Sequence, residues 1–121
     1  MATYVDGYLL PVPKKNLAAY RKMAKVGAAV WKDHGALHYF ECVGEDLAPK
    51  CGMPFPKAMK LKPGETVIFS FIVYKSRKHR DAVNARVMAD PRLSATINTM
   101  KKMPFDMKRM CVGGFETLVQ A

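Results

Sequence analysis

The 121-residue sequence is poor in acidic side chains, in cysteine and in long apolar runs. Its three cysteines, Cys42, Cys51 and Cys111, form an odd set without CxxC spacing, which argues against a disulfide framework and indicates reduced thiols. Cys42 and Cys111 lie in strand-like runs, so we expect them to be small core residues. The longest apolar stretch, residues 67–74, is too short to span a bilayer, and the start lacks a secretory signal. We therefore expect a cytoplasmic protein without a membrane partner.

Motifs for common enzyme chemistry are also missing. The sequence contains no nucleophile motif, no phosphate-binding glycine loop and no dinucleotide fingerprint. Phosphoryl transfer, Ser or Cys hydrolysis and NAD chemistry are therefore not indicated, and we expect no cofactor. Whether the protein is an enzyme is left open by the sequence.

A metal site has one weak candidate. His34, His38 and Cys42 follow one another at four-residue steps, which would place three zinc ligands on one face of a continuous helix. The helix is predicted to end at Gly35, before His38. We therefore expect no metal, and we interpret His34 as a hydrogen-bonded histidine at a helix terminus.

Basic residues are abundant. Twenty Lys and Arg against ten Asp and Glu give a formal net charge of +10 at pH 7. Such a balance is compatible with contact with a polyanion such as nucleic acid. It is equally compatible with a solvated basic surface that repels other copies, and we favour this second interpretation.

The length predicts a single domain over residues 1–121. Ser76 and the pair Asp90-Pro91 are helix-start signals. Strands are predicted over residues 4–12, 36–43, 66–74 and 108–119, and helices over 16–35, 76–89 and 90–103. In the first strand, Pro11 and Pro13 should end the pairing, and in the last one Gly113-Gly114 should mark a bulge or a close approach. Residues 44–64 form a long proline-rich loop, which we interpret as a lid or a dimer-contact arm.

This order of elements predicts an α+β fold, a ferredoxin-like four-stranded antiparallel sheet with helices on one face. The other face of the sheet is then uncovered. It should carry alternate residues of each strand, including either Tyr4 and Tyr8 or their neighbours, and large apolar side chains of the third strand. A monomer seldom leaves such a surface in water, so we expect a partner or a ligand to cover it.

Several segments together resemble a known family. They are Tyr-Val-Asp-Gly-Tyr at 4–8, Tyr-Phe-Glu-Cys-Val-Gly-Glu-Asp at 39–46, Ser-Arg-Lys-His-Arg-Asp-Ala-Val-Asn at 76–84, Val-Met-Ala-Asp-Pro-Arg at 87–92, Met-Pro-Phe-Asp at 103–106 and Gly-Gly-Phe-Glu at 113–116. The sequence resembles the YbaA-like family of bacterial proteins of unknown function, in the dimeric α+β barrel superfamily. The resemblance implies a ferredoxin-like subunit whose sheet pairs with that of a second copy, and it implies no established activity.

We expect this homodimer to bind a small, aromatic or acidic ligand, either between the sheet and its helices or across the dimer. Cofactor-free oxygenase- or isomerase-like chemistry follows by superfamily analogy alone. For such chemistry the predicted catalytic residues are Asp6, His38 and Tyr39, with Asp6 as a carboxylate between two tyrosines. The alternative for Asp6 is a structural acid bonded to tyrosine at a dimer interface. The predicted ligand-binding residues are Tyr4, Tyr8, Trp31, His34, Glu41, Phe69 and Phe71.

The alternative function is nucleic-acid binding, because RNA recognition domains share this topology and stack bases on sheet aromatics. Phe69-Ser70-Phe71 approximates the aromatic motif of their third strand, and residues 3–8 approximate the motif of their first. The basic and glycine residues that should precede Phe69 are missing. Alternating aromatics also suit any buried strand, so we place this hypothesis second.

Overall fold

The computed structural model describes residues 2–100 and 102–121. Four strands, β1 (Tyr4–Pro13), β2 (His38–Val43), β3 (Glu65–Tyr74) and β4 (Cys111–Glu116), form one antiparallel sheet in the order β2-β3-β1-β4. The helices are α1 (Leu17–Asp33), α2 (Phe55–Ala58), α3 (Arg77–Met88) and α4 (Pro91–Thr99), with short 3-10 turns at Lys14–Asn16 and Met107–Arg109. This is the predicted α+β ferredoxin-like arrangement.

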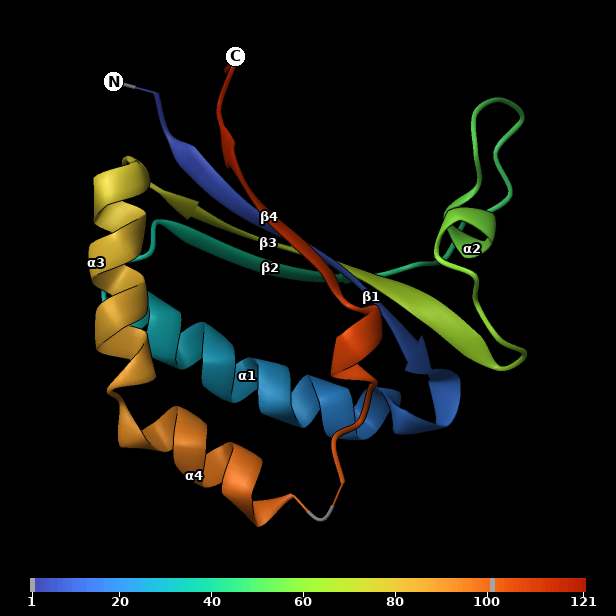
Figure 1. Cartoon of the computed structure of the whole chain (residues 1–121), viewed down its shortest axis with the longest axis horizontal. Coiled ribbons are helices and arrows are strands. Elements are labelled where there is room, and N and C mark those ends of the chain that lie inside the picture. Colours follow the sequence, from blue (N-terminus) through green and yellow to red (C-terminus); the bar gives the residue numbers. More distant parts are fainter. Residues whose placement is uncertain (1, 101) are drawn as a thin grey trace.

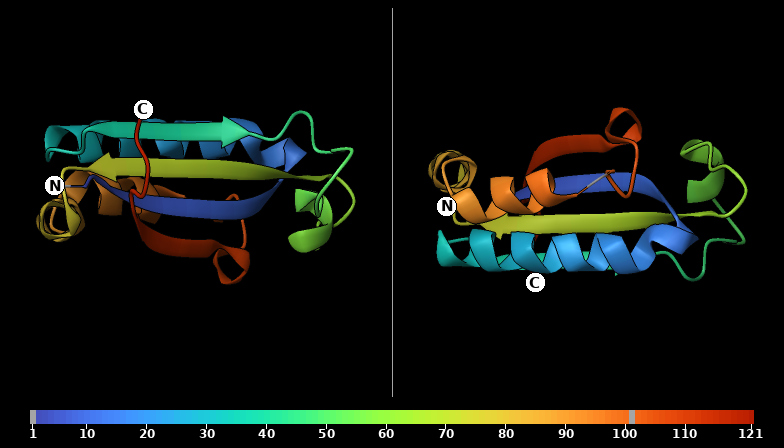
Figure 2. Two further views of the ribbon diagram at one scale, coloured as in Figure 1. Left: turned by 90° about the horizontal axis from the view of Figure 1, so that it is seen from above. Right: turned by 90° about the horizontal axis from the view of Figure 1, so that it is seen from below.

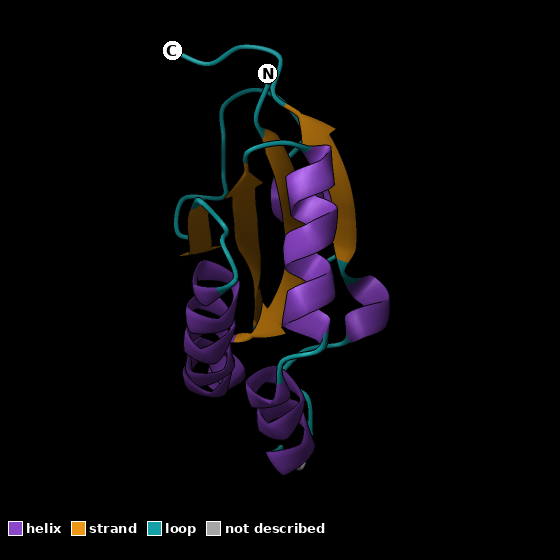
Figure 3. Ribbon diagram, turned by 90° about the vertical axis from the view of Figure 1, so that its left-hand side faces the viewer, coloured by secondary structure: helices purple, strands orange, loops and turns teal. Residues whose placement is uncertain are grey.

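The three longer helices, α1, α3 and α4, lie on one side of the sheet, whereas the short α2 lies over one end of β3 on the other side (Figure 1). In Figure 1 α1 and α4 run below the strands and α3 stands at one end of the sheet, while Figure 2 shows the four strands side by side. Figure 3 views the molecule from the end that α3 closes. Ser76 caps α3 by accepting a hydrogen bond from the His79 amide, and Asp90 caps α4 by accepting one from the Arg92 amide, as the sequence predicts. Among the described residues, no helix is long and apolar enough to cross a membrane.

Two buried clusters form the core between the sheet and the helices. The cluster near α3 includes Val30, Ile72 and Tyr74, and the cluster at the opposite end includes Leu10 and Tyr20. The partly buried side chain of Tyr8 packs against both clusters and lies between them. This middle region is where the candidate site lies.

The strand register defines the uncovered side of the sheet, which we call the open face. Its residues are Val5, Gly7, Leu9 and Pro11 of β1, His38, Phe40 and Cys42 of β2, Val67, Phe69, Phe71 and Val73 of β3, and Cys111, Gly113 and Phe115 of β4. Pro11 and Val67 are nevertheless buried, at the end of the sheet that α2 adjoins. The prediction of buried Cys42 and Cys111 was wrong: both are exposed, because their strands place them on this uncovered face at the two edges of the sheet.

Three further expectations need correction or refinement. The first strand ends at Pro13, as predicted, but Pro11 lies within it. Pairing of β4 with β1 stops at Leu9, so beyond that point β1 has a free edge, where a residue without an amide hydrogen is tolerated. Gly113-Gly114 is a close approach rather than a bulge, because its pairing with β1 is continuous and the Tyr4 ring occupies the space beside Gly114. The loop at 44–64 contains the short helix α2, which adjoins one end of the sheet.

Candidate functional site

A row of polar side chains crosses the helix-facing side of the sheet. Glu41 of β2 is paired with Ser70 of β3, and Ser70 is paired with Tyr8 of β1. Because side chains alternate along each strand and paired residues point to the same side, the three side chains lie next to one another. They form the polar floor of a cavity of about 200 Å³ between the sheet and the helices, which we call the inner cavity.

The remaining walls of the inner cavity are mostly apolar. The first helix contributes the longest stretch of wall, α4 contributes two side chains, and the segment before β4 contributes a phenylalanine and three methionines. These residues are Tyr20, Met23, Ala24, Gly27 and Trp31, then Leu93 and Ile97, then Met103, Phe105, Met107 and Met110. A carboxylate in such a setting is costly unless it is hydrogen-bonded.

Glu41 is held by two phenols. The Tyr20 hydroxyl donates to the Glu41 carboxylate at 2.9 Å from Oε1 and 3.2 Å from Oε2, and the Tyr39 hydroxyl lies 3.2 Å from Oε2. Within the described residues, no Lys, Arg or His forms an ion pair with Glu41. The carboxylate is therefore stabilised by neutral donors alone and keeps acceptor capacity for another molecule.

The tyrosines around Glu41 remain protonated. Burial, with the nearby Glu41 charge and the hydrogen bonds to it, raises the pKa of Tyr20 and of Tyr39 well above the usual value of 10. Burial, followed by the Asp6 charge, raises the pKa of Tyr8 to about 12. All three phenols are thus hydrogen-bond donors at physiological pH, and the Glu41 carboxylate is the hydrogen-bond acceptor for Tyr20 and Tyr39.

A second hollow lies on the other side of Glu41. This outer groove, of about 410 Å³, runs between α1 and the β2 edge and shares Tyr20, Ala24, Tyr39 and Glu41 with the inner cavity. Its other lining residues are Leu17, Arg21, Lys25, Ala28, Val43 and Ile68. Glu41 and its two phenols therefore form the partition between the two spaces.

Asp6, the first of the predicted catalytic residues, lies elsewhere. It is 3% exposed, and its carboxylate is bonded to Arg80 of α3 at 2.7 Å and to the Asn84 amide at 3.4 Å. Arg80 also lies over the Tyr4 ring, with its guanidinium carbon 4.9 Å from the ring centre. Asn84 in turn accepts hydrogen bonds from Trp31 and from Tyr74. These contacts are those of an internal ion pair that joins α3 to the sheet.

Tyr4 lies with Asp6, beside Arg80, and the other predicted residues lie in three further places. Tyr39 and Glu41 lie together at the partition described above, with Tyr8 and Trp31 in the same inner cavity. His38, Phe69 and Phe71 lie on the open face, on the opposite side of the sheet from Asp6 and Tyr39, because they occupy the alternate strand positions. His38 therefore cannot act with Asp6 or Tyr39 on one molecule within a single subunit.

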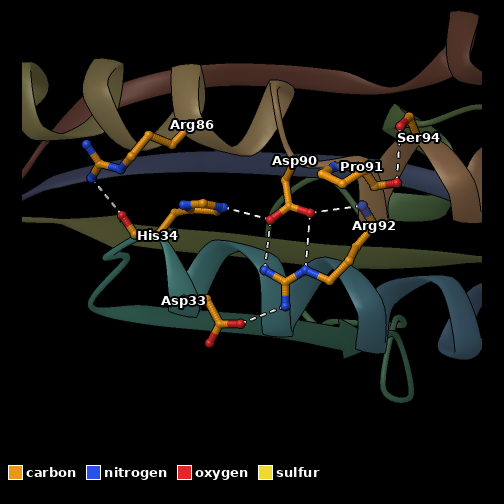
Figure 4. A network of polar contacts seen from close by, with 7 residues as sticks. All are labelled: Asp33, His34, Arg86, Asp90, Pro91, Arg92 and Ser94. Atoms are coloured by element: carbon orange, nitrogen blue, oxygen red, sulfur yellow. Dashed lines mark hydrogen bonds and ion pairs between the residues drawn. The ribbon is translucent and has the colours of Figure 1, made fainter.

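His34 occupies a third place, at the end of α1. Its Nε2 lies 2.8 Å from Asp90 Oδ2, and Figure 4 shows Asp90 also accepting hydrogen bonds from the Arg92 side chain, which reaches on to Asp33. The backbone carbonyl of His34 accepts a hydrogen bond from Arg86. This is the predicted hydrogen-bonded histidine at a helix terminus, and it tethers α1 to the start of α4.

Sequence reasoning missed Tyr20, Gly27 and Ser70. Ser70 is flanked by phenylalanines and belongs to an apolar strand, so its polarity alone does not mark it. The pairing of Ser70 with Glu41 is the signal, and that pairing depends on the register between β2 and β3. Gly27 leaves room for the Tyr39 hydroxyl, since a Cβ atom there would lie 2.9 Å from it.

Comparison with known proteins identifies relatives along almost the whole chain. Residues 3–107 match the family described as Protein of unknown function (DUF1428). The "Uncharacterized protein YbaA" of Escherichia coli (strain K12) and that of Shigella flexneri are each 41% identical over 116 residues, which is 96% of this chain and 97% of the relative.

Solved structures share the fold at low sequence identity. A NIPSNAP family protein with unknown function from Agrobacterium tumefaciens superposes with a TM-score of 0.59 at 16% identity, over 96% of this chain and 88% of that one. A dimeric ferredoxin-like protein from an uncultured marine organism gives 0.58 at 12% identity, over 100% of both chains. The fold follows from these likenesses and the family from the sequence matches: the chain belongs to the DUF1428 family of proteins of unknown function.

Proposed function

We propose that this protein binds a small, mostly apolar molecule between the sheet and the helices, and that the molecule donates a hydrogen bond to Glu41. One observation carries the proposal: a carboxylate without a cationic partner in the described part of the chain is the polar centre of an otherwise apolar cavity. Small-molecule sites have this form, with apolar walls and a few placed polar groups.

Physical cost favours a functional reason for Glu41. Removing a carboxylate from water without full compensation is unfavourable, and phenol donors compensate less than a cation does. A ligand that donates to the remaining acceptor sites of Glu41 would complete the hydrogen bonding of the carboxylate.

The same group supplies the chemistry if the bound molecule reacts. A carboxylate among protonated phenols can accept a proton from an acidic O–H or C–H group, and the phenols can donate hydrogen bonds to the anion that results. This is the step that cofactor-free oxygenases and isomerases need, and it assigns the role of base to Glu41 in place of Asp6. Tyr39 keeps its predicted place as an orienting group.

The proposal includes a homodimer formed through the open face. That face carries Phe40, Phe69 and Phe115, which are 50%, 46% and 61% exposed, and it holds a hollow of about 590 Å³ floored by Gly7 and Gly113. Apolar surface of this kind is usually covered. The ferredoxin-like neighbour from a marine organism is described as dimeric, which supports a second copy as the cover.

Nucleic-acid binding has less support from the same face. Tyr4 and Tyr8 point to the helix side, so the first strand presents Val5, Gly7 and Leu9 where RNA recognition domains need an aromatic platform. Among the open-face residues defined above there is no Lys or Arg to contact phosphates. The described Lys and Arg side chains lie on other surfaces of the molecule.

A ligand screen with matched variants tests the proposal. Single-ring phenols are screened by ligand-observed NMR, and hits are measured by calorimetry against wild type, Glu41→Gln and Glu45→Gln. Glu45 is exposed, so Glu45→Gln removes the same charge from a position outside the cavity. We expect Glu41→Gln to weaken binding about tenfold or more, as loss of a charged acceptor does, and Glu45→Gln to leave it unchanged. Equal binding by both variants would contradict the proposal.

A further inference from the structure

The outer groove has opposite charges on its two sides. Arg21 and Lys25 lie one helical turn apart on α1 and are both exposed, and within the described residues neither forms an ion pair. Glu41 lies on the β2 side of the same groove. The rest of the lining is apolar apart from the two phenols, so a molecule seated here meets two cations on the α1 side and the Glu41 carboxylate on the β2 side.

This arrangement restricts the ligand beyond the proposed function, on which the inference rests. An organic cation would be attracted to Glu41 but repelled by Arg21, Lys25 and the net charge of +10. A second carboxylate at Glu41 would be repelled by it, so an anionic group belongs at the Arg21 and Lys25 end. The end at Glu41 must then carry a donor such as a hydroxyl group.

The body of the ligand should be flat. The phenols of Tyr20 and Tyr39 line the groove beside Glu41. On the α1 side, the small side chains of Ala24 and Ala28 leave room for a ring. Aromatic rings pack well against such surfaces. We infer that the ligand of this site is an aromatic hydroxy acid, whose hydroxyl donates to Glu41 and whose carboxylate pairs with Arg21 and Lys25.

Calorimetry with matched probes tests the inference. The probes are 4-hydroxybenzoate, 4-hydroxyphenylacetate, benzoate without the hydroxyl, and 4-hydroxybenzyl alcohol without the charge. We expect at least one hydroxy acid to bind about tenfold or more tighter than benzoate and the alcohol, because each of these two probes lacks one charge-assisted contact. Added salt should weaken the binding of the hydroxy acid and leave the binding of the alcohol unchanged.

Variants assign the contacts. Arg21→Ala with Lys25→Ala should reduce the affinity of the hydroxy acid to that of the alcohol and leave the alcohol unaffected. Arg77→Ala with Lys78→Ala removes two exposed charges from α3 and is the matched control. Tight binding of the alcohol with no effect of the Arg21 and Lys25 changes would overturn the inference and leave the proposed function standing. Failure of every ring compound to bind would overturn both.

Discussion

At the scale of single residues, Asp6 distinguishes a structural carboxylate from a functional one. Asp6 is paired with Arg80 at 2.7 Å and lies outside the inner cavity, whereas Glu41 lies at its polar centre. Asp6 is buried and Glu41 is partly exposed, but this difference in exposure does not by itself separate the two roles. The type of partner does: a cation for Asp6 and neutral phenols for Glu41.

Asp6→Ala should therefore act on stability. Breaking an ion pair whose members are 5% and 19% exposed leaves Arg80 without its buried partner, and we expect the free energy of unfolding to fall by about 3 kcal/mol. Asp81, which also pairs with Arg80 but is 61% exposed, is the control, and Asp81→Ala should cost less than about 1 kcal/mol. Urea unfolding measures both. A folded Asp6→Asn protein that loses ligand binding would return Asp6 to the site.

Gly27 offers a change that affects the site more than the fold. A Cβ atom there would lie 2.9 Å from the Tyr39 hydroxyl, so Gly27→Ala should turn this phenol away from Glu41. The gain in helix propensity, about 1 kcal/mol, should offset the local crowding and keep the melting temperature within a few degrees of wild type. Ligand affinity should fall nevertheless. An unchanged affinity, measured by calorimetry, would mean that Tyr39 does not orient the ligand.

At the scale of elements, the start of α3 should respond to pH. Burial, with the nearby positive charges of Lys75 and Arg86, lowers the pKa of His79 below its usual 6.5, and its Nδ1 accepts a hydrogen bond from the Lys75 amide. The unfolded chain then takes up the proton first, so stability is complete above pH 6.5 and falls as the pH drops through the lower folded value.

NMR titration and unfolding measurements test this dependence. The His79 ring should titrate below pH 6.5, and His79→Asn, which keeps an acceptor at the same position, should remove part of the loss of stability between pH 6.5 and 5. A titration midpoint above 6.5, or the same pH dependence in the variant, would show that the ring is not held in its neutral form.

Local signals predicted the elements well because they depend on neighbours in the sequence. Ser76 and Asp90 cap their helices, and the alternation in the first strand separates Tyr4, Tyr8 and Leu10 from Val5 correctly. Alternation could not say which set faces the helices, because both are apolar enough to be buried. The predicted end of the first strand differs from the observed end at Pro13 by one residue, but the tolerance of Pro11 within the strand could not be predicted, since a free strand edge there depends on where β4 stops.

The candidate site depends on contacts that sequence patterns do not contain. Glu41 meets Tyr20 across 21 residues and Ser70 across 29, and both contacts require the register of β2 on β3 and the placement of α1 above it. His38 was predicted to act with Tyr39 at one site, yet the two are adjacent in a strand and therefore lie on opposite faces. A short list of polar residues was therefore recoverable, and their grouping was not.

At the scale of the whole molecule, the open face decides how the protein is assembled. Light scattering at physiological salt should give a molar mass near twice 13.5 kDa. Phe69→Glu introduces a charge in the middle of that face and should give a monomer, whereas Met88→Glu on α3, at a site that is 68% exposed, should remain dimeric. Both positions are exposed in a single subunit, so either variant should fold. If both keep the helical circular dichroism signal of wild type, the difference in their molar mass is a difference in assembly.

Either result bears on function because the two uses of the open face exclude each other. A dimer removes Phe69 and Phe71 from solvent and leaves the groove of Glu41 on the opposite side of the sheet accessible to a ligand. A wild-type monomer would leave the aromatic row free to stack on bases, and binding of single-stranded RNA should then be measured with Phe69→Glu as its control. Dissociation of the dimer by Phe69→Glu with unchanged ligand affinity would place the complete ligand site within one subunit.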